Sequence, residues 1–211
     1  MSQKRYLYYI WDFDGTLFDT YPVITAAFQH ALRDEGIQES SEVLSHSLQL
    51  SVDSTIVMYQ NRSHLEGLFI QHYLGYLASS PEKDQPPFPG AREICERVVR
   101  EGGKNFLVSH KGILAIMSLL DFYSLTHLFT DIISRENGFP RKPDPGAFLH
   151  LARKYVLDPQ EVLTIGDRWI DMEAAKEAGM ATCLIDPGDT LPGYEVDYRV
   201  RELGEVPRII G

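Results

Sequence analysis

The chain has 211 residues, which is enough for one sizeable α/β core with a small insertion. Hydrophobic residues make up 44% of it, a globular rather than a disordered composition. The formal net charge is −10 and no long run of Lys or Arg occurs, which argues against a nucleic-acid partner because such a partner would require a basic face.

Cysteine content and apolar runs exclude several other classes of protein. Cys95 and Cys183 are far apart and form no zinc-binding spacing, so buried free thiols are expected. Residues 1–5 are polar, and the apolar run that follows is too brief for a signal sequence or a bilayer span. We therefore expect a cytoplasmic protein with no membrane partner.

The first predicted element is a buried strand over residues 7–11, a continuous apolar run that ends in a turn signal. A helix follows over residues 22–34, with Pro22 in its first turn. From residue 36 to about residue 80 the apolar residues keep a helical period, which predicts a small all-helical insertion. Residues 82–90 are rich in charge and proline and predict a linker back to the core.

Beyond residue 90, predicted helices and strands alternate. The helices are expected at 91–100, 113–121, 145–155 and 172–178, and the strands at 106–109, 131–133, 162–165 and 182–185. This order predicts an α/β, Rossmann-like, mostly parallel sheet with helices on both faces, plus the helical insertion after the first strand. Such sheets bind ligands at the carboxyl ends of their strands.

The most informative segment directly follows the first predicted strand. Asp12 and Asp14 stand two residues apart, where the buried strand meets a turn formed by Gly15 and Thr16. Carboxylates held together at a sheet edge suit a metal ion or a phosphoryl group, although Asp and Gly are also common at ordinary strand exits. The remaining polar residues decide between these interpretations.

Further polar residues lie just past other predicted strands. Ser109 and Asp167 each follow a strand, Lys142 lies in a loop, and Asp171 is one helical turn beyond Asp167. We expect four carboxylates, one hydroxyl and one lysine to meet on one rim, which requires a cation. Oxygen ligands favour Mg²⁺ over zinc, and such a site suits a dianionic phosphoryl group that a carboxylate can attack.

In order and character these segments resemble the four motifs of the haloacid dehalogenase-like (HAD) hydrolase superfamily. The motifs are Asp12-Phe13-Asp14-Gly15-Thr16, Ser109, Lys142-Pro143 and Gly166-Asp167-Arg168-Trp169-Ile170-Asp171. Residues 18–20 and 174–179 are similar to the phosphoglycolate-phosphatase-like branch. The helical insertion lies where that superfamily carries its type-1 cap. The resemblance thus implies an α/β core domain of residues 1–19 and 86–211, with a helical cap domain of residues 20–85.

The resemblance also implies catalytic and metal-binding roles. Asp12 would be the nucleophile that forms an aspartyl-phosphate, and Asp14 the general acid and base; both would contribute to the metal site, Asp14 through its backbone carbonyl. Ser109 would donate a hydrogen bond to phosphoryl oxygens, and Lys142 would neutralise charge on the nucleophile and the phosphate. Among the remaining metal residues, Asp167 would bind Mg²⁺ directly, and Asp171 would support either the shell of the metal or Lys142.

Four residues are predicted to bind substrate. Gly15 and Thr16 belong to the turn of the first motif, and His110 stands where the second motif more often has Asn. A loop histidine with a backbone partner is the alternative for His110. Arg62, in the predicted cap, has a guanidinium group whose donors match a carboxylate or a second phosphate. The alternative, which its position favours, is a solvated arginine at a helix end.

We therefore predict a Mg²⁺-dependent phosphatase acting on a small phosphorylated metabolite, such as phosphoglycolate or a sugar phosphate, as a monomer or weak homodimer. A dehalogenase would lack Asp14. A sugar phosphomutase is the main alternative, although it would carry a cap histidine where this chain has Ile24. A response-regulator receiver would lack the insertion, and a non-catalytic binding protein would typically have lost Asp12 or Asp14.

Overall fold

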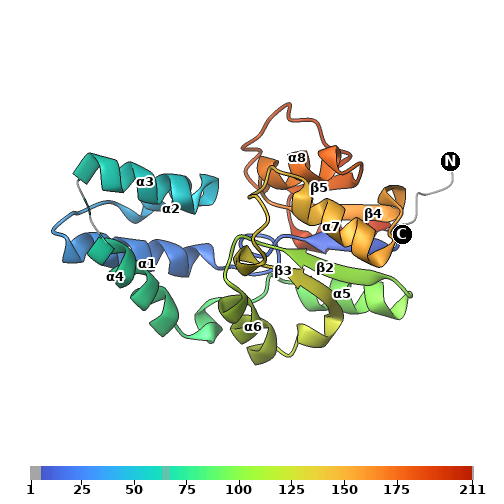
Figure 1. Cartoon of the computed structure of the whole chain (residues 1–211), viewed down its shortest axis with the longest axis horizontal. Coiled ribbons are helices and arrows are strands. Elements are labelled where there is room, and N and C mark those ends of the chain that lie inside the picture. Colours follow the sequence, from blue (N-terminus) through green and yellow to red (C-terminus); the bar gives the residue numbers. More distant parts are fainter. Residues whose placement is uncertain (1–5, 64, 66, 211) are drawn as a thin grey trace. The chain divides into compact units, whose positions relative to one another are not determined.

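The computed structural model describes residues 6–63, 65 and 67–210, and the chain divides into two compact units (Figure 1). The first unit comprises Met1–Phe18 and Pro87–Gly211, and the second comprises Asp19–Pro86. Within the described residues no helix is long and apolar enough to span a membrane.

A six-stranded sheet forms the centre of the first unit. Its strands are β1 (Tyr8–Trp11), β2 (Lys104–Val108), β3 (Phe129–Ile133), β4 (Val162–Gly166), β5 (Ala181–Ile185) and β6 (Tyr198–Val200). They are ordered β3-β2-β1-β4-β5-β6, and each strand runs parallel to its neighbours. Trp11 lies opposite Leu107 of β2 on one side and Ile165 of β4 on the other. The strand order therefore reverses at β1, where sheets of this kind bind ligands.

Helices cover both faces of the sheet (Figure 1). They are α5 (Ala91–Arg100), α6 (Ile113–Phe122), α7 (Gly146–Tyr155), α8 (Trp169–Glu177) and the short α9 (Pro207–Ile210). Trp11 belongs to a buried cluster with Ile94 of α5, whereas its neighbour Ile10 belongs to a separate cluster with Phe148 of α7. Because successive strand residues point to opposite faces, both faces of β1 must be apolar. The predicted α/β, Rossmann-like fold is confirmed.

The second unit is helical in its described residues and has a hydrophobic core of its own. Its helices are α1 (Tyr21–Asp34), α2 (Ser41–Leu50), α3 (Val52–Ser63) and α4 (Gly67–Ser79). The fully buried ring of Phe28 packs edge-on against Tyr59 at 5.5 Å, Phe69 at 5.1 Å and Tyr73 at 5.4 Å between ring centroids. This aromatic cluster joins α1, α3 and α4.

Two features of the first unit differ from the sequence-based expectation. α8 begins at Trp169 rather than at residue 172, because Asp171 N–H already donates to the carbonyl of Arg168 at 3.2 Å and closes a first turn. β6 and α9 were not predicted. β6 has only three residues, of which Val200 alone is buried, so it lacks the apolar run that marks a core strand.

Candidate active site

Asp12 directly follows β1, and the sheet fixes its backbone. Its N–H donates to the carbonyl of Ile165 at 2.9 Å, which continues the pairing with β4. The chain then turns through Gly15, whose φ of +81° favours glycine. The Gly15 N–H donates to the carbonyl of Phe18 at 2.9 Å and closes the turn. The hydroxyl of Thr16 donates to Asp167 Oδ1 at 3.3 Å, so this turn is tied to the end of β4.

Lys142 joins two of the carboxylates in the interior of the first unit. Its Nζ lies 2.6 Å from Asp12 Oδ1, pairs with Asp171 Oδ1, and donates to the carbonyl of Val108 at 3.1 Å. The side chains of Lys142, Asp12 and Asp171 are 2%, 1% and 1% exposed. All three donors of the ammonium group therefore have partners that water hardly reaches.

The charges of this buried group depend on one another. Burial by itself would lower the pKa of Lys142, but the carboxylates of Asp12 and Asp171 outweigh it and raise that pKa. Burial raises the pKa of Asp12, and so does the neighbouring charge of Asp171, while Lys142 and Arg168 act in the opposite direction. The net effect raises the pKa of Asp12 above its ordinary value, and the two cations beside it limit that rise.

Three carboxylates form a cluster that could hold a cation. Asp12, Asp167 and Asp171 each offer an oxygen, and these oxygens lie within 4.8 Å of one another. Asp12 Oδ2 and Asp171 Oδ2 are buried and have no hydrogen-bond partner within the described part of the chain. Burial, followed by the charge of Asp12, raises the pKa of Asp167 well above its usual range. A crowded set of oxygen donors with unsatisfied buried atoms fits a hard divalent cation such as Mg²⁺.

A cation that the sequence analysis did not single out also lies at this cluster. The Arg168 guanidinium is 3.7 Å from Asp12 Oδ2, and its Nε is 3.9 Å from both Asp167 Oδ1 and Asp171 Oδ2. Its position beside Asp167 carries no spacing signal of its own. Only the folded arrangement of the three carboxylates shows that one arginine reaches all of them.

The loop after β2 supplies the remaining polar groups. Ser109 is buried, and its Oγ accepts a hydrogen bond from the Lys111 N–H at 3.1 Å. Lys111 Nζ in turn lies 2.8 Å from Asp14 Oδ1, with both side chains largely buried. The sequence did not indicate what Lys111 contacts. The structure pairs it with the carboxylate of Asp14, which lies outside the three-carboxylate cluster.

His110 has a backbone partner. Its Nε2 accepts a hydrogen bond from the Lys142 N–H at 2.9 Å. Burial, reinforced by the positive charge of Lys142, lowers the pKa of His110 to about 4, so the imidazole is neutral near pH 7 and can accept this bond. His110 thus orients the backbone from which Lys142 projects, and the predicted contact of His110 with substrate stays a prediction.

Gly166, the last residue of β4, makes room for Asp171. A Cβ atom placed on Gly166 would lie 2.6 Å from Asp171 Cβ and 2.8 Å from its Cγ, closer than carbon atoms can approach. The first turn of α8 can therefore lie against the end of β4 only because residue 166 has no side chain. That close approach brings Asp171 to Lys142.

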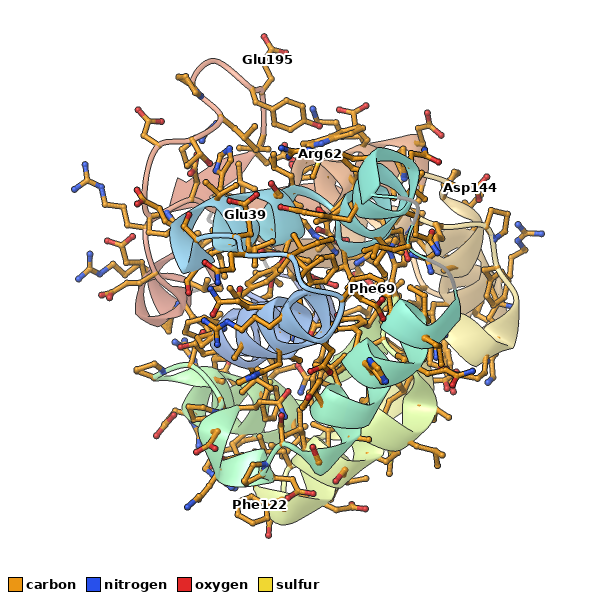
Figure 2. All side chains as sticks on the ribbon, turned by 90° about the vertical axis from the view of Figure 1, so that its left-hand side faces the viewer. Glu39, Arg62, Phe69, Phe122, Asp144 and Glu195 are labelled. Atoms are coloured by element: carbon orange, nitrogen blue, oxygen red, sulfur yellow. The ribbon has the colours of Figure 1, made fainter. Side chains whose placement is uncertain are left out.

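The first unit brings most of the predicted site residues to one end of the sheet. They are Asp12, Asp14, Gly15, Thr16, Ser109, His110, Lys142, Asp167 and Asp171. Arg62 belongs to the second unit, where it is exposed in the last turn of α3 (Figure 2). Its predicted contact with substrate stays a prediction.

Comparisons with known proteins give the chain a family context. Residues 9–185 match the family model described as haloacid dehalogenase-like hydrolase. A phosphoglycolate phosphatase from Cereibacter sphaeroides is 27% identical over 190 residues, covering 85% of this chain and 84% of the relative.

Two solved structures extend the comparison. A hydrolase from Streptococcus pneumoniae is 33% identical with a TM-score of 0.62, over 84% of this chain and 91% of that chain. A putative phosphatase from Clostridium difficile reaches a TM-score of 0.84 at 20% identity, over 99% of this chain and 100% of that chain. The second similarity concerns the fold alone.

Proposed function

This chain belongs to the haloacid dehalogenase-like hydrolase family, and on that premise we propose that it is a Mg²⁺-dependent phosphatase for a small phosphate monoester. The reaction would pass through an aspartyl-phosphate on Asp12. The enzyme class and the resemblance to the phosphoglycolate-phosphatase-like branch, both expected from the motifs, agree with the family match and with the curated relatives. The metal, the intermediate and the substrate are parts of the proposal.

One observation carries the proposal: the buried ammonium group of Lys142 bridges Asp12 and Asp171, whose remaining oxygens face a third carboxylate, Asp167. A purely structural ion pair would not need a third, partly buried carboxylate beside two buried oxygens that lack hydrogen bonds. The arrangement suits a site that takes up both a cation and an anionic group.

In the first step, the ionised Asp12 would attack phosphorus. The new bond joins a carboxylate oxygen to phosphorus while the bond from phosphorus to the ester oxygen breaks. Lys142 holds Asp12 Oδ1 at 2.6 Å, which leaves Oδ2 as the oxygen without a hydrogen bond and hence the better candidate for attack or for cation binding. Ser109 would donate its hydroxyl hydrogen to a phosphoryl oxygen.

Asp14 would act as the general acid in the first step and as the general base in the second. It would give a proton to the departing ester oxygen, then take one from the water that hydrolyses the aspartyl-phosphate and releases inorganic phosphate. Asp14 is more exposed than Asp12, with 19% of its side chain accessible, as suits a group that meets a leaving group and water. Its ion pair with Lys111 would have to loosen before it acts as an acid.

Asp12, Asp167 and the backbone carbonyl of Asp14 would hold Mg²⁺, with Asp171 supporting them. When bound, the ion would offset negative charge on the phosphoryl oxygens and on the nucleophile. We also propose that the second unit is the cap and that it selects the substrate by its leaving group. The proposed substrate contacts are Gly15, Thr16 and His110 of the first unit and Arg62 of the second.

The test is phosphate release from a panel of small phosphate esters, with Mg²⁺ and with EDTA. The panel contains phosphoglycolate, several sugar phosphates and nucleotides. We expect Mg²⁺-dependent release by the wild type and a loss of at least about 10³-fold in Asp12→Asn, because the amide cannot serve as the covalent nucleophile.

A matched variant separates a specific loss from a general effect of removing one carboxylate. Asp131→Asn makes the same chemical change on β3, where Asp131 pairs with Lys154 rather than with the site, and it should retain activity. Asp12→Asn that keeps most of its Mg²⁺-dependent activity would refute the nucleophile. Circular dichroism on both variants verifies that they fold.

A further inference from the structure

Arg168 faces all three carboxylates of the acidic cluster, although the mechanism above gives it no step. Its guanidinium lies 3.7 Å from Asp12 Oδ2, and its Nε lies 3.9 Å from Asp167 Oδ1 and from Asp171 Oδ2. Its side chain is only 15% exposed, so solvent screens these interactions weakly. One arginine therefore approaches the oxygens that a divalent cation would need.

Two of the carboxylate oxygens near Arg168 are those to which Lys142 does not bind. Lys142 binds Oδ1 of both Asp12 and Asp171, whereas Oδ2 of each is buried without a hydrogen-bond partner in the described chain. Arg168 lies 3.7 Å from Asp12 Oδ2 and 3.9 Å from Asp171 Oδ2, beyond hydrogen-bond distance of both. Its contribution at those two oxygens is charge.

The formal charges of the cluster indicate how Arg168 affects the binding of a cation. With all three carboxylates ionised, as a bound cation would require, the cluster with Lys142 and Arg168 carries a formal charge of −1, and Mg²⁺ would bring it to +1. Without Arg168 the same group carries −2, which Mg²⁺ would neutralise fully. Arg168 thus stabilises the metal-free cluster and weakens its binding of Mg²⁺.

We propose that Arg168 is a built-in counter-cation that holds the acidic cluster together before metal binding and lowers its affinity for Mg²⁺. A dianionic phosphoryl group would bring the charge of the Mg²⁺-loaded group from +1 to −1. Arg168 therefore makes tight Mg²⁺ binding depend on the substrate phosphate. This inference rests on the proposed function, because it takes the acidic cluster as the cation site.

The test compares wild type with Arg168→Met, which keeps most of the side-chain length and removes the charge. Thermal unfolding of the full chain is followed from EDTA to saturating Mg²⁺, and calorimetry gives the Mg²⁺ affinity. We expect Arg168→Met to melt below wild type in EDTA, to lose that deficit in Mg²⁺, and to bind Mg²⁺ at least about tenfold more tightly. Inorganic phosphate should tighten Mg²⁺ binding more in wild type than in the variant, because only the wild-type Mg²⁺-loaded cluster carries a net positive charge for the anion to offset.

Arg199→Met is the matched control. Arg199 is a partly buried arginine that pairs with the buried carboxylate of Asp186, outside the three-carboxylate cluster. Its loss should lower the melting temperature equally with and without Mg²⁺. If Arg168→Met behaves like Arg199→Met, Arg168 is merely structural and the proposal is wrong.

Two other outcomes would also overturn the proposal. Unchanged Mg²⁺ affinity with weaker phosphate binding in Arg168→Met would make Arg168 a phosphate ligand instead. A wild-type chain that shows no response to Mg²⁺ by either method would remove the proposed cation site, and the inference with it. Failure of the proposed cation site is recognised in the wild type itself, which would not respond to Mg²⁺. Failure of the proposal for Arg168 alone is recognised only when the variant is compared with a wild type that does respond.

Discussion

Replacing Lys142 by Met should destabilise the metal-free protein severely. Lys142 Nζ contacts Asp12 Oδ1 at 2.6 Å and also pairs with Asp171, and each of these side chains is 2% exposed or less. Met fills a similar volume but leaves two buried carboxylates without their shared cation. Breaking a buried ion pair from one side costs about 3–5 kcal/mol.

That cost corresponds to a fall of roughly 6–20 °C in Tm, at about 2–4 °C per kcal/mol for a chain of this size. The assay is thermal unfolding in EDTA near neutral pH, followed by circular dichroism and calorimetry. Adding Asp171→Asn to Lys142→Met should recover part of the loss, because the double variant has one fewer buried charge to leave unpaired.

Lys154→Met is the matched control for this prediction. Lys154 Nζ lies 2.8 Å from Asp131 Oδ2, a comparable separation, but the lysine side chain is 49% exposed, so its loss should change Tm little. If Lys142→Met melts within about 2 °C of wild type, a shift that corresponds to no more than roughly 1 kcal/mol, the buried ion-pair network contributes little to the stability of the fold.

Two further predictions concern the end of β4. Gly166→Ala should lower both Tm and phosphate release, because its Cβ would lie 2.6 Å from Asp171 Cβ and displace that side chain; an unchanged kcat would contradict this. Asp167→Asn should raise Tm in EDTA at about pH 8 and have little effect below about pH 4. Burial is the main cause that raises the folded pKa of Asp167, so the destabilisation begins as pH rises above the ordinary Asp pKa of about 4 and is complete once pH exceeds the folded pKa. Melting curves across this pH range, which should show no such trend in Mg²⁺, provide the check.

The sequence was sufficient for the α/β fold because local signals and the fold agree. Continuous apolar runs marked the central strands, whose two faces are both covered, and helical periods marked the intervening segments. It failed at β6, where a partly exposed edge segment of three residues carries no apolar run, and at the first turn of α8.

For the site, the sequence by itself supplied the candidate residues and their location at one edge of the sheet. Asp12, Asp14, Ser109 and Asp167 could be placed at one rim because parallel strands end at the same edge of a sheet. The position of Lys142 in a loop showed only that a cation was present. Family membership followed from motif order, which needs no coordinates.

Only the tertiary structure decided which charges meet. Ion pairs between residues distant in the chain depend on how loops pack, so no spacing rule pairs Lys142 with both Asp12 and Asp171, or Lys111 with Asp14. The neutral state of His110 likewise follows from its burial beside Lys142. Sequence order determined which polar groups stand at the end of each strand. Packing at that edge of the sheet determined which groups pair, how their pKa values shift and which carboxylates Arg168 approaches. The reason is that electrostatic energies depend on distance and burial rather than on position in the chain.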